Sequence, residues 1–447
     1  MTDAPTSTPT SADKRPLRIL IGSDTFPPDV NGAATFTQRL ATGLAERGHE
    51  VHMMVPATSA GHGVFVEQYD GVDITVHRIY SWRWYPHPWV RFMLPWRVKA
   101  NAEKIVRAIK PDAIHFQSHI IVGRGLVTAG RKHGIRVVGT NHTMPENILQ
   151  HVEILPSFML KWLTDIQWNS AKKWFGRADS ISAPTRRAAD YFEKHTGLWM
   201  HAISCGIDTR FYTPDFSPRT GNVITFVGRL DEEKYIHELF EAVAVLDPAL
   251  DVRVEVIGDG DVRTKLERTA VALGVADRVN FQGRVSDEQL RATLTATTVF
   301  AMPSRAELQS IATMEAMASG LPVVAADAMA LPHLVHSDEN GYLYQPGDID
   351  EFAGYLTRIL TASPEELERL KRGALKTVEA HDINRTLDTF EGLYRGEDVV
   401  DPVTESERAP ESVASWADRF LAAGRVARSR LDSLSAPRRR RGGSSAG

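Results

Sequence analysis

The sequence predicts an α/β protein made of two Rossmann-like, doubly wound domains. Short apolar runs bounded by turn-forming residues alternate with stretches of helical periodicity, which is the pattern of a parallel sheet covered by helices. This series begins near Leu17 and starts again near residue 222. A chain of 447 residues is also too long for one ordinary hydrophobic core.

The first series opens with the apolar run LRILIGS, residues 17–23, which suits a strand buried on both faces. A helical stripe of Phe36, Leu40 and Leu44 follows and ends at Gly48, where a left-handed cap is expected. The next strand-like runs are HEVHMMVP (49–56), DAIHF (112–116), RVVGT (136–140) and SISAP (180–184). We assign residues 17–200 to an N-terminal domain.

The second series supplies a C-terminal domain at residues 201–380, with the stretch 198–221 as the linker. We expect residues 381–397 to form a helix that can cross back to the first domain. Residues 1–16 are expected to be a disordered leader, and residues 398–447 a linker and basic tail. The strand-like runs of this series are NVITFVGRL, VRVEVIGDG, VNFQG, TVFAMPS and PVVAADA.

Composition argues against several classes of protein. A net charge of -4 gives no overall attraction to nucleic acid, and the single cysteine, Cys205, excludes an internal disulfide framework. There is no apolar run of about 18 residues and no apolar core of a signal peptide. We therefore expect a cytoplasmic protein without a nucleic-acid partner.

Two segments of the second series place candidate ligand-binding residues directly after strands, where open α/β sheets bind their ligands. VGRLDEEK supplies Arg229 and Lys234, two cations that can clamp a diphosphate. VIGDGD supplies Gly258, in a turn whose backbone can approach a ligand closely. Neither segment is specific by itself, because exposed cations and tight turns are common.

The segment PSRAELQSIATMEAMASGLPVVAADA is more specific. It places Glu307 in a loop and Glu315 in the following helix, with seven residues between them. Ser310 is expected to cap this helix, so that backbone N–H groups near Ile311 can bind an anion. The two carboxylates can accept hydrogen bonds from the hydroxyls of a sugar and of a ribose.

PSRAELQSIATMEAMASGLPVVA, GRLDEEK and SCGIDTRFYTP resemble glycosyltransferase family 4, whose members have the GT-B fold, over roughly residues 17–395. The resemblance implies retaining sugar transfer from a nucleotide-sugar, without a metal or other cofactor. It implies that Arg229 and Lys234 hold the donor diphosphate, that Glu307 holds the transferred sugar and that Glu315 binds the ribose. The family often has Phe-Gly after the first glutamate, whereas this chain has Leu308 and Gln309, then Ser310. We count these three, Ile311 and Arg284 among the donor-binding candidates.

Candidates in the first domain are a loop and two histidines. In the family, the loop after the first strand contacts the donor phosphate and the acceptor, which points here to Asn31 and Gly32. Relatives often carry a functional histidine where this chain has Gln117. His119 and His142, each just after a strand, are the alternatives that the sequence leaves open. We place His119 with Glu307, Arg229 and Lys234 in the catalytic set, and His142 on the acceptor side.

The segment 79–101 interleaves tryptophans with cations and contains no acid. This composition suits docking on an anionic membrane surface, although packing in the core or at a subunit contact is the alternative. The acceptor-side candidates here are Trp82, Trp84, Trp89 and Arg91.

TNHTMPEN and HFQSH resemble actinobacterial-type lipid mannosyl- and glucosyltransferases. This resemblance implies transfer of a hexose, from GDP-mannose in preference to UDP-glucose, to a membrane glycolipid with alpha linkage. The protein would be peripheral on the inner face of the cell membrane. A nucleotide-sugar epimerase of the same architecture and a non-enzymatic sugar-nucleotide sensor are the rival interpretations.

Overall fold

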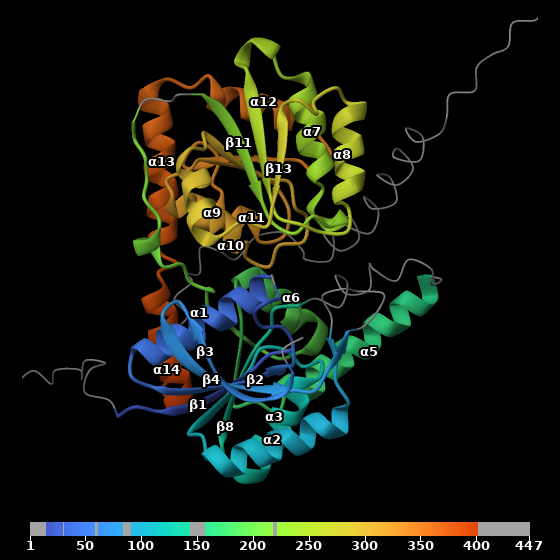
Figure 1. Ribbon diagram of the computed structural model, residues 1–447, viewed down its shortest axis with the longest axis vertical. Helices are drawn as coiled ribbons and strands as arrows, with labels where there is room; N and C mark the ends of the chain where they lie inside the picture. The colour runs from blue at the N-terminus through green and yellow to red at the C-terminus, as the bar shows by residue number, and fades with distance from the viewer. Residues whose placement is uncertain are drawn as a thin grey trace, which may run out of the picture. The chain divides into compact units, whose positions relative to one another are not determined.

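The computed structural model describes residues 15–29, 31–58, 61–83, 91–143, 157–217 and 221–400. Within them, two separate parallel sheets carry helices on their faces, which confirms the prediction of two doubly wound α/β domains (Figure 1). Residues 1–14 of the expected leader, the side chains of Trp84 and Trp89, and the basic tail from residue 401 lie outside the described residues.

The first sheet has eight strands in the order β10-β9-β8-β7-β1-β2-β4-β3. All neighbouring strands are parallel except the edge strand β3, which is antiparallel to β4. The strands are β1 (Arg18–Gly22), β2 (Glu50–Pro56), β3 (Gly63–Tyr69), β4 (Val72–Ile79), β7 (Ala113–Phe116), β8 (Arg136–Thr140), β9 (Ser180–Ala183) and β10 (His201–Ala202). β10 falls in the stretch that we expected to be linker. A separate hairpin pairs β5 (Trp82–Arg83) with β6 (Arg91–Phe92).

The first helix shows how the sequence determines the elements of this domain. Asn31 precedes it and its side chain accepts a hydrogen bond of 2.9 Å from the backbone of Ala34. The predicted stripe of Phe36, Leu40 and Leu44 is buried, and the chain turns at Gly48 with a φ of 87°. The helices are α1 (Gly32–Glu46), α2 (Pro95–Ile109), α3 (Val122–His133), α5 (Ser157–Phe175) and α6 (Arg186–Thr196).

The second sheet has six parallel strands in the order β13-β12-β11-β14-β15-β16. They are β11 (Asn222–Val227), β12 (Val252–Ile257), β13 (Val279–Gly283), β14 (Val299–Met302), β15 (Val323–Ala326) and β16 (Gly341–Tyr344). The helices are α7 (Ile236–Val245), α8 (Arg263–Ala272), α9 (Asp287–Thr295), α10 (Ile311–Ala318), α11 (Leu331–Leu334), α12 (Ile349–Leu360) and α13 (Pro364–Glu379). The strand order reverses between β11 and β14, and loops at such a switch point form a ligand-binding crevice.

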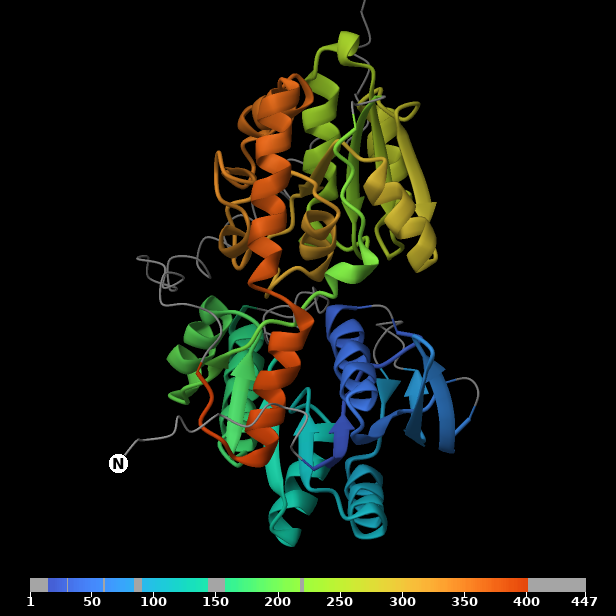
Figure 2. The same cartoon turned by 90° about the vertical axis from the view of Figure 1, so that its left-hand side faces the viewer.

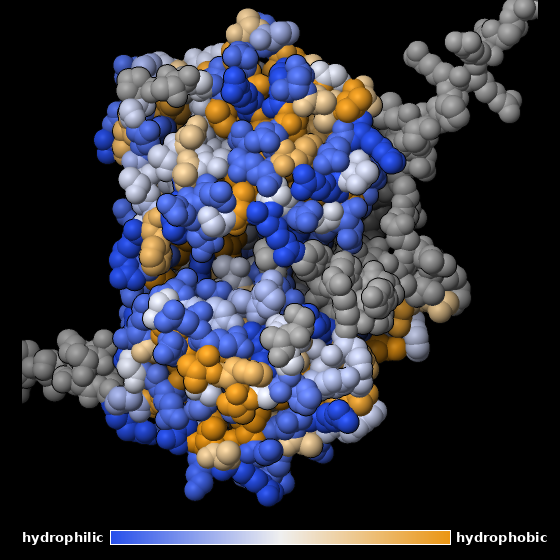
Figure 3. Space-filling model, in the orientation of Figure 1, coloured by the Kyte–Doolittle hydropathy of each residue, from blue (hydrophilic) through white to orange (hydrophobic). Residues whose placement is uncertain are grey.

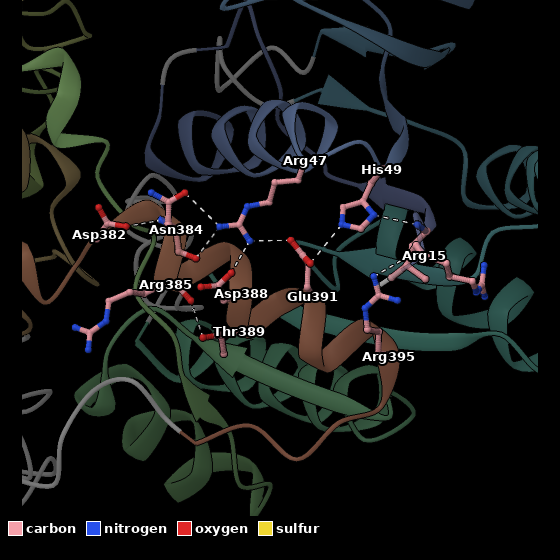
Figure 4. A network of polar contacts seen from close by, with 11 residues as sticks. Arg15, Arg47, His49, Asp382, Asn384, Arg385, Asp388, Thr389, Glu391 and Arg395 are labelled. Atoms are coloured by element: carbon pink, nitrogen blue, oxygen red, sulfur yellow. Dashed lines mark hydrogen bonds and ion pairs between the residues drawn. The ribbon is translucent and has the colours of Figure 1, made fainter. Parts of the chain in front are cut away.

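The last described helix, α14 (Ile383–Arg395), packs against α1, β7 and β8 of the first domain (Figure 2). Arg47, which ends α1, lies 2.7 Å from Asp388 and 2.8 Å from Glu391. His49 accepts a hydrogen bond of 3.0 Å at Nδ1 from the backbone of Leu17, so its Nε2 carries the proton and faces Glu391 at 3.5 Å (Figure 4). Glu391 therefore joins α14 to two elements of the first domain.

Burial by itself would raise the pKa of Glu391, but hydrogen bonds from His49 and Arg47 outweigh burial and lower the pKa to about 2. The ionised carboxylate therefore stabilises the fold above the ordinary pKa of 4.5, and this stabilisation is lost as the pH falls toward about 2.

We expect Glu391→Gln to lower the free energy of unfolding by about 1–3 kcal/mol near neutral pH, because a neutral amide weakens the charge-assisted hydrogen bonds. Urea denaturation at decreasing pH should show the difference from wild type shrinking. Glu368→Gln, which removes an exposed pair with Arg372 on α13, is the matched control and should change little. A difference that persists undiminished in acid would contradict the assignment.

Candidate active site

The switch point of the second sheet brings together predicted residues that are far apart in the sequence. Lys234 belongs to a single 3₁₀ turn, Glu232–Lys234, in the loop after β11, and Glu307 lies in the loop after β14. The Nζ atom of Lys234 lies 2.5 Å from Oε1 of Glu307, and these side chains are only 12% and 13% exposed. Because β11 and β14 are neighbours in the sheet, their loops emerge side by side at its carboxyl edge.

Each member of this buried pair keeps the other ionised. Burial would raise the pKa of Glu307, but attraction to Lys234 and hydrogen bonds from Lys234 and Ser304 outweigh it and lower the pKa. Burial would lower the pKa of Lys234, but attraction to Glu307 and Glu233 outweighs it and raises the pKa. The site therefore holds a charged carboxylate and a charged ammonium group at neutral pH.

Arg229, the second predicted cation, is engaged by two acids of the same loop. It lies 2.5 Å from Oδ2 of Asp231 and 3.1 Å from Oε1 of Glu233. Glu233 is also 3.9 Å from Nζ of Lys234, so it lies between the two cations. Our sequence analysis missed Glu233, although the run of acids between Arg229 and Lys234 was visible. A diphosphate that binds these cations must therefore compete with carboxylates.

Arg305 joins the loop after β14 to the loop after β11 and was also missed. Its guanidinium group stacks on the ring of Tyr235, 3.8 Å from the centroid, and forms an ion pair with Glu238 of α7. Tyr344 donates a hydrogen bond of 2.9 Å to Glu238, and the Arg305 backbone N–H donates one of 3.2 Å to the carbonyl of Glu233. These contacts fix the spacing of the loops that carry Lys234 and Glu307.

The start of α10 differs from our expectation. Ser310 occupies the N-cap position, but it has a φ of 72° and its side chain caps no backbone N–H. Its hydroxyl instead lies 2.8 Å from the hydroxyl of Thr313. The predicted capping bond is therefore wrong, because the left-handed backbone turns the side chain away from the capping direction. The N–H groups at this helix start are not engaged by Ser310, which suits an anion site.

The side chain of Gln309, one of the predicted donor-binding residues, forms hydrogen bonds within the protein. Its Oε1 accepts a hydrogen bond of 2.7 Å from the backbone of Cys205, and its Nε2 donates one of 2.8 Å to the hydroxyl of Ser204. The carbonyl of Leu308 accepts a hydrogen bond of 3.0 Å from Thr185, at the start of α6. The loop that carries Glu307 is thus attached to the linker and to the first domain.

Packing requires glycine at one of the two glycine candidates. A Cβ atom on Gly258, whose φ is 132°, would lie 1.9 Å from the carbonyl oxygen of Gly228, so the approach of these two loops requires glycine. A Cβ on Gly32 would lie 3.9 Å from Cδ1 of Ile311, which places the start of α1 near the start of α10. Asn31 uses its side chain to cap α1.

Two of the arginine candidates lie near the loop after β1. Burial raises the pKa of Asp29, and the charges of Arg91, Arg78 and Arg284 partly offset this effect. Arg91 comes from the hairpin strand β6, whereas Arg284 follows β13 of the second sheet. Asp29 therefore lies within the electrostatic reach of a donor-side and an acceptor-side candidate.

Comparisons with known proteins agree with this architecture. The model described as "Glycosyltransferase Family 4" matches residues 30–211, and that described as "Glycosyl transferases group 1" matches residues 213–377. The "GDP-mannose-dependent alpha-mannosyltransferase" of Mycolicibacterium smegmatis is 29% identical over 388 residues, covering 85% of this chain and 97% of that protein. The chain is a family 4 glycosyltransferase with the GT-B fold. This result confirms the family and the fold that the sequence motifs implied.

Two further comparisons agree with this result, the first in sequence and the second in fold. The "Alpha-monoglucosyldiacylglycerol synthase" of Streptococcus pneumoniae is 25% identical over 400 residues, covering 84% of this chain and 85% of that protein. The crystal structure of Anabaena HepE in complex with UDP-glucose superimposes with a TM-score of 0.66 at 18% identity, covering 85% of this chain and 99% of that chain. Membership of the family favours sugar transfer over the epimerase and sensor interpretations.

Both candidate histidines of the glycosyltransferase lie at the carboxyl ends of strands in the first sheet, where His119 is buried and His142 is partly buried. Burial lowers the pKa of His119, after β7, to about 4, and the pKa of His142, after β8, to about 3. Nε2 of His142 donates a hydrogen bond of 2.7 Å to the side chain of Gln117, and its ring lies 4.9 Å from that of Phe36. Both imidazoles are therefore neutral at neutral pH, and the choice between them stays open.

Several aromatic rings of the described part of the segment 79–101 are exposed. Trp82 is 40% exposed and stacks on Phe92, while Trp96 of α2 is 67% exposed. Figure 3 shows apolar residues gathered where Figure 1 has β3 and β4, and Val64, Phe65 and Val66 of β3 are exposed. None of the described helices is both long and apolar enough to cross a membrane. The rings of Trp82 and Trp96 thus face outward instead of packing in the core.

We expect Lys234→Met to lower transferase kcat/KM by about 30-fold or more, because it leaves the carboxylate of Glu307 buried without its cation. The pKa of Glu307 should rise, so the activity that remains should depend more steeply on pH than that of wild type. Lys265→Met is the matched control, since its pair with Glu232, at 2.7 Å, is exposed. Steady-state kinetics on both variants make the comparison, and equal losses would refute the role of the buried pair.

Proposed function

We propose that this glycosyltransferase transfers mannose from GDP-mannose to a membrane glycolipid, with retention and hence an alpha linkage. The observation that carries the proposal is the buried pair of Lys234 and Glu307, with Arg229 beside it, at the switch point of the second sheet. The name of the Mycolicibacterium smegmatis relative supports GDP-mannose. The Streptococcus pneumoniae relative, named for a glucosyl lipid product, supports a lipid acceptor.

In the proposed reaction, the charged groups of the site first bind the donor and then stabilise the leaving group. Arg229, Lys234 and the N–H groups at the start of α10 bind the donor diphosphate, Glu307 accepts a hydrogen bond from a sugar hydroxyl, and Glu315 binds the ribose. The bond between the anomeric carbon and the diphosphate oxygen breaks, and the acceptor oxygen attacks from the same face. The acceptor proton passes to the leaving diphosphate oxygen, whose charge the two cations stabilise.

The same site suggests which residues contact the acceptor and why the reaction can proceed without a metal. His119 or His142, being neutral, can accept or donate a hydrogen bond where the acceptor meets the sugar. We propose that the reaction needs no metal, because two cations and a helix start offset the charge that a metal would otherwise offset. UDP-glucose is the second candidate donor, supported by the UDP-glucose complex of Anabaena HepE.

Incubation of the protein with labelled GDP-mannose and UDP-glucose, each with total lipid extract, tests the proposal. We expect label to enter the lipid fraction from GDP-mannose, unchanged by a chelator of divalent metals, and enzymatic digestion of the product to report an alpha linkage. Transfer from UDP-glucose alone would replace the proposed donor. Absence of transfer from every donor in the presence of lipid would overturn the proposed activity.

We also propose that the protein docks on the cytoplasmic face of the membrane through exposed rings and cations in the described part of residues 79–101. Trp96 is 67% exposed, and Arg97 beside it stacks over Tyr80 at 5.7 Å from the ring centroid. Rings and cations of this kind partition to a headgroup interface.

We expect wild-type protein to co-sediment with anionic vesicles and to be released by salt, because the attraction is partly electrostatic. The double variant Trp82→Ser/Trp96→Ser should bind severalfold less. Trp199→Ser is the matched control, since Trp199 is 52% exposed beside β10 and outside this segment. Absence of wild-type binding at every salt concentration would refute docking, and equal loss in the control would refute this surface.

A further inference from the structure

Arg39, in the middle of α1 in the first domain, reaches a donor-site residue of the second domain. Its Nη2 atom lies 2.6 Å from Oε1 of Glu315, and the side chains are 23% and 11% exposed. The same Nη2 lies 3.5 Å from the hydroxyl of Tyr212, which follows the 3₁₀ turn Thr209–Phe211. Three segments of the chain thus meet at the carboxylate to which we assign the ribose.

The surroundings of Arg39 and Tyr212 determine the protonation of both side chains. Burial would lower the pKa of Arg39, but Glu315 and Tyr212 outweigh it and raise the pKa, so the guanidinium group stays charged. Burial and the nearby Glu315 raise the pKa of Tyr212, so its hydroxyl stays neutral. A cation and a neutral hydroxyl therefore hold the carboxylate of Glu315 between them.

The second terminal nitrogen of Arg39, Nη1, is buried and has no hydrogen-bond partner among the described residues. A buried donor without an acceptor is costly, particularly on a charged group. A ribose hydroxyl would satisfy it, because a hydroxyl can donate to a carboxylate and at the same time accept from a guanidinium group.

We propose that Arg39 is a donor-recognition residue, which holds Glu315 in place and donates a hydrogen bond from Nη1 to a ribose hydroxyl of the nucleotide. This inference rests on the proposed donor site and adds a residue from the opposite domain to it. Recognition of the ribose is then complete only when α1 and α10 lie together. Residues of both domains accordingly bind the nucleotide, and not residues of the second domain alone.

The competing explanation is that Arg39 only holds α1 against α10. Arg47 offers a matched comparison, because it ends the same helix and also forms ion pairs between segments, with Asp388 and Glu391 of α14. A purely structural contact would change stability and would weaken the binding of all nucleotides equally. A contact with the ribose would instead change the discrimination between ribose and deoxyribose.

The experiment compares the binding of GDP and 2′,3′-dideoxy-GDP, and of the matching uridine pair, by calorimetry for wild type, Arg39→Met, Arg39→Lys and Arg47→Met. We expect wild type to prefer the ribonucleotide by about tenfold or more, and Arg39→Met to lose most of this preference. Arg39→Lys should regain part of it, and Arg47→Met should keep it. The donor KM should rise in Arg39→Met by about tenfold, with a smaller change in kcat.

The outcomes separate this inference from the proposed function. If wild type binds no nucleotide, the proposed function fails and this inference fails with it. If wild type discriminates between the sugars and Arg39→Met discriminates equally well, the proposed function stands and the role of Arg39 is refuted. Equal loss of preference in Arg47→Met would also refute it.

Discussion

The ion pair between Lys234 and Glu307 is the interaction on which the organisation of the proposed donor site depends. Burying a charged side chain away from water is costly unless the charge is paired, and several charged side chains are buried together at the switch point of the second sheet. The protein meets this constraint by placing Asp231, Glu233 and Glu307 around Arg229 and Lys234. Under the proposed function, binding of a diphosphate would exchange partners between groups already in place, and it would require no new charge to be buried alone.

The surrounding fold holds this balance of charges at one geometry. Arg305 connects the loops after β11 and β14, and Gln309 attaches the second of these loops to Ser204 in the linker. Ser204 is also 3.0 Å from Nδ1 of His381, and its carbonyl accepts a hydrogen bond of 3.0 Å from Thr386 at the start of α14. The two passages of the chain between the domains are therefore bound to each other, and the Glu307 loop is bound to both.

The sequence predicted those parts of the fold and site that have a local signature. Strands buried on both faces, such as β1 and β11, are continuous apolar runs, whereas the edge strand β3 is largely exposed and gave no such run. Arg229, Lys234, Glu307 and Glu315 were predicted from their spacing and from the family resemblance, and the structure brings Lys234 and Glu307 together. Arg39 was not predicted, because nothing in the neighbouring sequence distinguishes an arginine exposed on a helix surface from one that contacts Glu315. Ser310 was expected to cap α10, and only the backbone angle shows that it does not.

One face of α1 accounts for much of what the local patterns could not show. A Cβ on Gly32 would approach Ile311 of α10, Arg39 binds Glu315, and Arg47 binds Glu391 of α14. Between these positions, Phe36 lies against Phe390 of α14, and Gly43 lies against Leu387 of the same helix. These positions recur every three or four residues, so they lie on one stripe of the helix. Residues that look like an ordinary amphipathic pattern therefore form a shared surface, against which α10 and α14 both pack.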